Sequence, residues 1–249
     1  MCYNFNSFNG ASNQSRISRK EEINLKTNKY KKINLDKWDR AELFNEFINM
    51  TTSIYDMTVR MDVTRLINYS KENGQSFFIN YLYLALRELN AIPEFRMRIH
   101  NGQPYLYSRI DCSFTVANNY GYFVNRSTEF TDYKTFYQNV SAIAEKAKNE
   151  KNTYPELSDL TRTDLIYFSV IPWVDYQSMT LPVLTNPHGT NDQTYNTVPC
   201  VGWGKYVEEN GRFKMSMHIK VSHAFIDGKP LADAFNNIQD AINELNFEQ

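Results

Sequence analysis

The sequence has few of the features that mark secreted, membrane-spanning or nucleic-acid-binding proteins. Its only cysteines are Cys2, Cys112 and Cys200, and they form no CxxC or other ligand-spaced pair. This pattern predicts neither a disulfide framework nor a zinc site, and free thiols are typical of a reducing compartment. Acidic and basic residues nearly balance, at 28 and 27. Because there is no excess of positive charge, a nucleic-acid partner is not predicted.

Long apolar runs are also missing. None approaches the length of a membrane span, and the first residues have no apolar segment like that of a secretion signal. We therefore expect a cytoplasmic protein with no membrane partner. Residues 1–29 are polar and without period, which predicts a mobile tail. No linker rich in Pro, Gly or Ser divides residues 30–249, so we expect them to form a single domain.

Helical and strand periods are mixed along this domain. The pairs Asn101-Gly102 and Asn210-Gly211 each separate two strand-like segments and predict hairpins. Hairpins among helices, without strict βαβ order, predict an α+β fold with a mixed, mostly antiparallel sheet covered by helices. Asp36 is expected to cap the first helix. The predicted helices span residues 38–47, 64–73, 77–89, 136–147 and 231–245, and the predicted strands span residues 55–63, 95–100, 105–110, 113–117, 122–125, 165–170, 201–207 and 212–221.

The last predicted strand leads into Val221-Ser222-His223-Ala224-Phe225-Ile226-Asp227-Gly228. If the alternation continues, His223 points inward with the apolar side, whereas His218 lies on the polar side and is expected to be solvated or locally hydrogen-bonded. A neutral histidine at a strand end can accept a proton near pH 7, so His223 is a candidate general base. The alternatives are a histidine packed in the core and an ordinary turn at Asp227.

A second candidate, Ser169-Val170-Ile171-Pro172-Trp173, ends another predicted strand. A hydroxyl at Ser169 can donate a hydrogen bond to an oxyanion, and Pro172 fixes the direction in which the chain leaves. The alternative is a plain strand end with a packed tryptophan. A Ser/His/Asp hydrolase triad is also conceivable, but the sequence has no Gly-x-Ser-x-Gly elbow. It also has no phosphate loop, dinucleotide-binding glycine motif or HExxH metal motif.

In their order and spacing, these features resemble the type A chloramphenicol acetyltransferases. The resemblance extends from about Lys31 to Leu245, and it implies the fold of that family. The shared motifs are Trp38-x-Arg40, Pro93-Glu94-Phe95-Arg96-Met97-Arg98, Ser169-x-x-Pro172-Trp173, Gly204-Lys205-Tyr206 and His223-x-x-x-Asp227-Gly228.

The resemblance implies acetyl transfer from acetyl-CoA, a co-substrate, to an alcohol, without a metal and in a homotrimer with sites between subunits. It implies that His223 is the general base and that Ser169 stabilises the oxyanion. Asp227 is implied to pair with Arg40 and to support the histidine loop. The residues implied to contact CoA are Trp173, Lys205 and Tyr206, and those implied to surround the acceptor, each of which is otherwise ordinary core, are Phe47, Tyr55, Tyr154 and Leu181.

Several departures from the family pattern concern the acceptor more than the reaction. Ser222 stands where relatives usually have a second histidine, and Gly202 where they often have a threonine near the oxyanion. Residues 118–123 replace a glutamate-rich segment, and the irregular segment 182–199 is longer than expected. Chloramphenicol is the leading acceptor. The alternatives are an acyltransferase for another hydroxylated small molecule and a non-catalytic ligand-binding relative.

Overall fold

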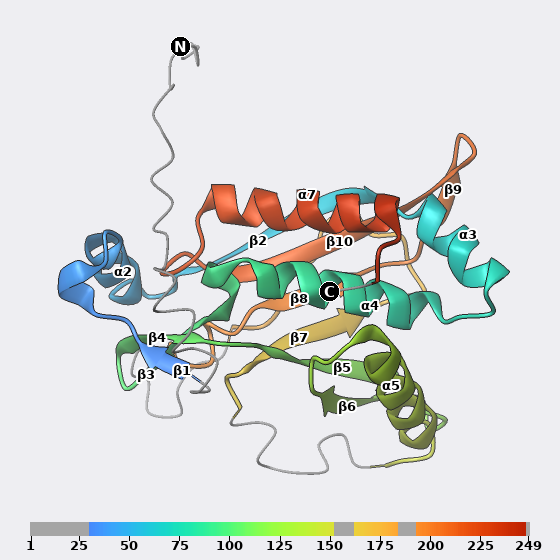
Figure 1. Ribbon diagram of the computed structural model, residues 1–249, viewed down its shortest axis with the longest axis horizontal. Helices are drawn as coiled ribbons and strands as arrows, with labels where there is room; N and C mark the ends of the chain where they lie inside the picture. Colours follow the sequence, from blue (N-terminus) through green and yellow to red (C-terminus); the bar gives the residue numbers. More distant parts are fainter. Residues whose placement is uncertain (1–29, 152–161, 184–192, 248–249) are drawn as a thin grey trace.

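The computed structural model describes residues 30–151, 162–183 and 193–247. The predicted tail at residues 1–29 and the predicted acceptor residue Tyr154 lie outside the described residues. Within the described ranges the helices and strands follow the α+β pattern expected from the sequence (Figure 1).

A mixed sheet forms the centre of the fold. Its strand order is β2-β10-β8-β7-β5-β6, and the short strand β9 also pairs with β10. The pairs β5–β7 and β7–β8 are parallel and the other pairs are antiparallel, which confirms the mixed, mostly antiparallel sheet. A smaller sheet has the order β1-β4-β3. The bounds are β1 Tyr30–Lys32, β2 Ile54–Asp62, β3 Met97–His100, β4 Gln103–Tyr107, β5 Asp111–Ala117, β6 Phe123–Thr128, β7 Leu165–Val170, β8 Cys200–Trp203, β9 Val207–Glu209 and β10 Arg212–Ser222.

Helices cover one face of the large sheet (Figure 1). The apolar side of β10 packs toward them, and the hydroxyl of Tyr81 in α4 contacts the sulfur of Met217. The opposite face therefore carries the polar positions of the same strands. The helices are α2 Ala41–Ile48, α3 Thr64–Glu72, α4 Phe77–Ala91, α5 Tyr133–Ala147 and α7 Gly228–Glu244, with 3₁₀ turns η1 at Leu35–Lys37 and η2 at Pro93–Arg96.

Local sequence explains many of these boundaries. The side chains of Ser76 and Asp132 accept hydrogen bonds from the first turns of α4 and α5, as N-caps do. At both predicted hairpins the Asn and the Gly have positive φ, as a type I′ turn requires. The two hairpins, β3–β4 and β9–β10, are thus confirmed.

Three local predictions are wrong. Asn34, rather than Asp36, caps the first turn, η1, and α2 begins only at Ala41. The predicted strand 201–207 is broken, because the chain leaves the sheet between β8 and β9. The polar side of β10 is buried, so the expectation that His218 is solvated is wrong, whereas the other expectation, a hydrogen-bonded ring, is confirmed by its contact with Tyr176.

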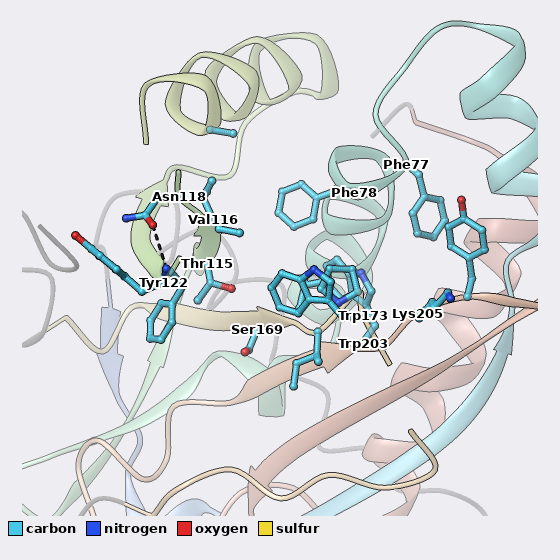
Figure 2. Close-up of a pocket in the computed structure, with 18 of the residues that line it drawn as sticks. Phe77, Phe78, Thr115, Val116, Asn118, Tyr122, Ser169, Trp173, Trp203 and Lys205 are labelled. Carbon is cyan, nitrogen blue, oxygen red and sulfur yellow. Dashed lines mark hydrogen bonds between the residues drawn. The ribbon is translucent and has the colours of Figure 1, made fainter. Parts of the chain in front are cut away.

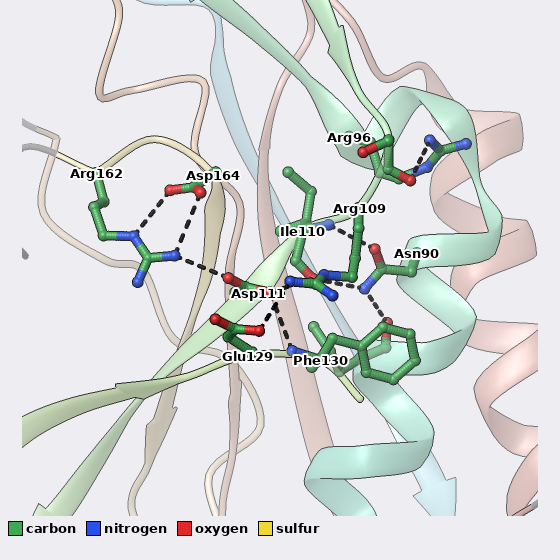
Figure 3. A network of polar contacts seen from close by, with 11 residues as sticks. Asn90, Arg96, Arg109, Ile110, Asp111, Glu129, Phe130, Arg162 and Asp164 are labelled. Carbon is green, nitrogen blue, oxygen red and sulfur yellow. Dashed lines mark hydrogen bonds and ion pairs between the residues drawn. The ribbon is translucent and has the colours of Figure 1, made fainter. Parts of the chain in front are cut away.

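A polar network stabilises the beginnings of β5 and β7, at the end of the strands opposite Ser169 (Figure 3). Asp111, at the start of β5, accepts from Arg162 at 2.9 Å and from the backbone N–H of Phe130 at 3.0 Å. Arg162 also pairs with Asp164 just before β7. Asn90 of α4 exchanges two hydrogen bonds with the backbone of Ile110. These contacts fix the parallel strands β5 and β7 against α4, and hence the register in which β7 delivers Ser169.

Candidate active site

His223 is the first residue after β10. The strand alternation that would have pointed its side chain inward therefore ends before it. Its side chain is 37% exposed. Its ring stacks on Phe47 from α2, with centroids 4.1 Å apart and planes at 12°, and Tyr55 from β2 lies at 4.9 Å. The two aromatic rings hold the imidazole in place, while a third of the side chain stays open to a substrate.

Arg40 binds the loop that carries His223. Its Nη2 donates to the His223 carbonyl at 2.6 Å, and its Nε donates to the Ala224 carbonyl at 3.2 Å. Both nitrogens of its fork also bond to the Asp227 carboxylate. A planar guanidinium can serve all these acceptors at once, whereas an ammonium cannot. Arg40 therefore ties the backbone at the start of the loop to the side chain of Asp227 at its end.

Asp227 faces the histidine as well as the arginine. Its Oδ1 lies 3.0 Å from His223 Nδ1, but the angles do not make a hydrogen bond, and Nδ1 has no hydrogen-bond partner among the described residues. Both carboxylate oxygens are engaged by Arg40. This arrangement suits a supporting ion pair better than a proton relay.

Tyr55 also supports the loop. Its hydroxyl donates to the Ile226 carbonyl at 3.1 Å. Burial, and then the charge of Asp227, raise the pKa of Tyr55 to about 12, so the phenol keeps the proton it donates. On the other side of the loop, Phe225 packs against Trp38 and Phe44.

A buried polar cluster lies below His223. The hydroxyls of Ser53 and Ser222 are 2.7 Å apart, and Ser53 donates to the Gln193 side chain at 2.6 Å. Gln193 donates in turn to the carbonyls of Ile48 and Met50 at the end of α2. Ser222 is therefore part of a satisfied network. No local pattern in the sequence indicated it, because its members come from three separate segments, residues 48–53, Gln193 and Ser222.

The second part of the site is a cavity of about 1060 Å³ (Figure 2). Ser169, Trp173, Lys205 and Tyr206 all line it, so the structure brings four predicted residues together. Trp173 is 72% exposed and stands at the cavity. The walls are mainly apolar and come from α4, β5, the turn between β5 and β6, and the start of β6, including Phe77, Phe78, Val116, Tyr122 and Phe123.

Within one chain the two parts are far apart. Ser169 of β7 pairs with Gly202 of β8, and Gly202 pairs with His218 of β10. His223 follows His218 by five residues, which is about 16 Å along the strand, and the strands of Ser169 and His223 lie about 10 Å apart. Ser169 and His223 of one copy cannot touch the same reacting atom.

Comparisons with known proteins identify the family. A family model described as chloramphenicol acetyltransferase matches residues 28–239. The chain belongs to the chloramphenicol acetyltransferase family. Membership makes it an acyltransferase.

Individual relatives agree with this assignment. A chloramphenicol acetyltransferase of Campylobacter coli is 28% identical over 229 residues, covering 86% of this chain and 99% of the relative. One of Staphylococcus aureus is 26% identical over 216 residues, covering 86% and 96%. The solved structure of a chloramphenicol acetyltransferase has a TM-score of 0.76 at 28% identity, covering 86% of this chain and 99% of that one. A probable dihydrolipoamide acetyltransferase from Listeria monocytogenes shares the fold, with a TM-score of 0.58 at 14% identity and coverages of 86% and 95%.

The structure sorts the predicted site residues of this family member into two groups. Phe47 and Tyr55 lie against His223, with Arg40 and Asp227 behind it. The other group is Ser169 with the three further cavity residues, Trp173, Lys205 and Tyr206. Leu181 is half-buried and does not line the cavity. In the described ranges, no cluster of three His, Cys, Asp or Glu side chains has the geometry of a metal site. None of the helices there has the length and apolar character that crossing a membrane requires.

Proposed function

We propose that this chain is a CoA-dependent O-acetyltransferase, with chloramphenicol as the leading acceptor. The observation that carries the proposal is the cavity that combines Ser169 with Trp173, Lys205 and Tyr206. A long, mostly apolar pocket suits the pantetheine arm of acetyl-CoA, an exposed tryptophan can pack against it, and Lys205 can meet a phosphate as a point charge.

In the proposed reaction His223 is the general base. The acceptor hydroxyl gives its proton to Nε2 of the imidazole, because Nδ1 faces the Asp227 carboxylate. The hydroxyl oxygen then bonds to the thioester carbonyl carbon, and Ser169 donates a hydrogen bond to the oxyanion that forms. When the oxyanion collapses, the carbon–sulfur bond breaks. The imidazolium returns the proton to the CoA thiolate, so the products are an ester and free CoA.

The site is proposed to form between two copies of the chain in a homotrimer. His223 and Ser169 of one copy are separated by five strand residues and two strand spacings. In the proposed assembly, His223 of one copy meets Ser169 of its neighbour, and Phe47 and Tyr55 line the acceptor side. The exposed ring of Trp173 at the cavity is compatible with a partner surface there.

The test is a screen of hydroxylated acceptors that measures thiol release from acetyl-CoA. Acetylation of chloramphenicol, verified by mass spectrometry of the ester, is the expected result. If thiol were released with another alcohol but not with chloramphenicol, the proposed acceptor would be wrong and the proposed reaction would stand. If the protein bound CoA and chloramphenicol without any turnover, a ligand-binding role would replace the enzyme.

A further inference from the structure

His218 is a buried histidine outside the motifs that indicated the site, and it lies close to Ser169. The register of three adjacent strands places Ser169, Gly202 and His218 in one row. Thr115 of β5 lies beyond Ser169, because its neighbour Phe114 pairs with Phe168. All four side-chain positions point to the sheet face away from α4 and α7. The row is polar, although this part of the sheet is covered.

The imidazole of His218 lies over Gly202. A Cβ at Gly202 would collide with His218 Cε1, and it would lie 2.9 Å from Nδ1 and 2.7 Å from the Ser169 carbonyl oxygen. The Cε1–Nδ1 edge of the ring therefore lies over β8, the strand between β10 and β7. Glycine is the only residue that leaves this space. The φ angle at Gly202 is unremarkable, so the constraint comes from the His218 ring and the Ser169 carbonyl.

One nitrogen of the ring is engaged and the other is not. The Tyr176 hydroxyl is 2.9 Å from His218 Nδ1, and the Tyr176 ring occupies the space over Gly204, two residues beyond Gly202. Nε2 is buried and has no hydrogen-bond partner among the described residues. A buried polar atom without a partner is rare and carries a free-energy cost, so it points to a missing ligand.

The protonation state of the ring follows from its surroundings. Burial, and then the charge of Lys220, lower the pKa of His218 to about 4, so the ring is neutral at pH 7. Burial also raises the pKa of Tyr176 well above its usual range, so the phenol keeps its proton. If the Tyr176 phenol donates to an unprotonated Nδ1, the hydrogen on Nε2 is the only polar hydrogen of these two side chains without a partner. We therefore assign the proton to Nε2.

We propose that the Nε2–H of His218 is a second hydrogen-bond donor to the thioester oxygen that Ser169 contacts. This inference rests on the proposed acetyl transfer. A neutral imidazole N–H and a serine hydroxyl on either side of Gly202, in one row of one sheet face, can converge on a single oxygen, and a buried donor acts there with little competition from water. Tyr176 then acts as a positioning residue, which fixes the tautomer and the ring.

Nitrogen-15 NMR of the histidine side chains tests the assignment without turnover. We expect a protonated Nε2 and an unprotonated Nδ1 for His218. Acetyl-CoA should shift the Nε2–H resonance more than CoA does, because only acetyl-CoA brings a carbonyl oxygen. A proton on Nδ1, or equal shifts with both compounds, would overturn the donor role.

Kinetics with His218→Phe tests the role in catalysis. Phenylalanine keeps the ring but has no N–H, so kcat should fall about 10- to 100-fold, with KM for acetyl-CoA changed less than about twofold. Tyr176→Phe should cause a smaller loss. Thr58→Val is the matched control, because Thr58 pairs with His218 on the side away from Gly202, and it should keep the parent rate.

The outcomes separate this inference from the proposed function. If the parent turns over an alcohol and His218→Phe matches it, the donor role is overturned and acetyl transfer stands. If the parent turns over no alcohol, the proposed function fails and the donor role fails with it. Circular dichroism verifies that the variant folds. If it does not fold, the tautomer and the acetyl-CoA shift decide.

Discussion

The two parts of the site differ in how complete they are within one chain. Around His223, Arg40 bonds to two carbonyls and a carboxylate, and two aromatic rings hold the imidazole. Around Ser169 there is an open cavity with an exposed tryptophan at its edge. The histidine part is preorganised by its own chain, whereas the serine part is arranged to receive a ligand or a partner.

This difference indicates a division of tasks. In the proposed mechanism His223 is a general base, which must be held within a narrow range of positions, and short-range contacts support it. A binding cavity must exchange its occupant at each turnover, so its apolar walls stay exposed. Variants of the two parts should therefore fail in different ways.

The largest effect is expected for His223→Ala. Loss of a general base lowers kcat by about 100- to 10,000-fold. Because the cavity around Ser169 is separate, the affinity for CoA measured by calorimetry should stay within about twofold of the parent. His100→Ala is the control, since His100 bonds to Tyr107 in the small sheet and lies outside the site. A His223→Ala variant with the parent rate would remove the general base from the mechanism.

Mixed oligomers give the sharpest test of whether the site is divided between two copies of the chain. Ser169→Ala should lower kcat about 100-fold, and its subunits still carry His223. Co-refolding Ser169→Ala with His223→Ala should restore about a quarter of the parent activity, because random pairing makes that share of interfaces intact in a symmetric oligomer. Separate tags on the two chains verify mixing. Mixed oligomers no more active than the better variant would show that the site lies within one chain.

The resemblance implied the pairing of Arg40 with Asp227, which no local pattern could indicate, because the two residues lie 187 positions apart. His223 and Asp227 are four residues apart just after β10, and Arg40 follows Trp38 by two residues. The helices and both hairpins also followed from periodicity and Asn-Gly pairs. The turn of the chain away from β10 at His223 could not be predicted, since the Ser53 carbonyl that binds the His223 N–H lies in a distant segment.

The serine part was predicted less completely for a physical reason. The polar side of β10 is typical of a solvated face, and only the chain folding over it buries His218. Tyr176, which reaches His218, lies in an irregular segment with no period to place it. The row Ser169-Gly202-His218 depends on the register of three strands, and register is a property of the whole sheet.

Arg40→Lys should separate support from chemistry. Lysine keeps the charge but cannot bond to the His223 carbonyl, the Ala224 carbonyl and both Asp227 oxygens at once. A small displacement of the base lowers kcat by about 10- to 100-fold while KM for acetyl-CoA stays near the parent value. Arg212→Lys is the matched control, because Arg212 pairs with Asp62 at the surface. Equal losses in both variants would argue against a specific role of Arg40.

The smallest effect concerns the dependence of stability on pH, and it distinguishes the buried His218 from the half-exposed His223. The folded protein resists protonation of His218 until about pH 4, whereas the unfolded chain takes up that proton below about 6.5. Protons therefore favour the unfolded chain between these values, and the free energy of unfolding should fall by about 3 kcal/mol from this group as the pH drops through that window. Urea unfolding followed by circular dichroism measures the fall. The His218→Asn variant has no titrating ring, so its free energy of unfolding should depend less on pH between 6.5 and 4. If the variant showed the parent slope, the buried row around Ser169 and His218 would not exclude the proton.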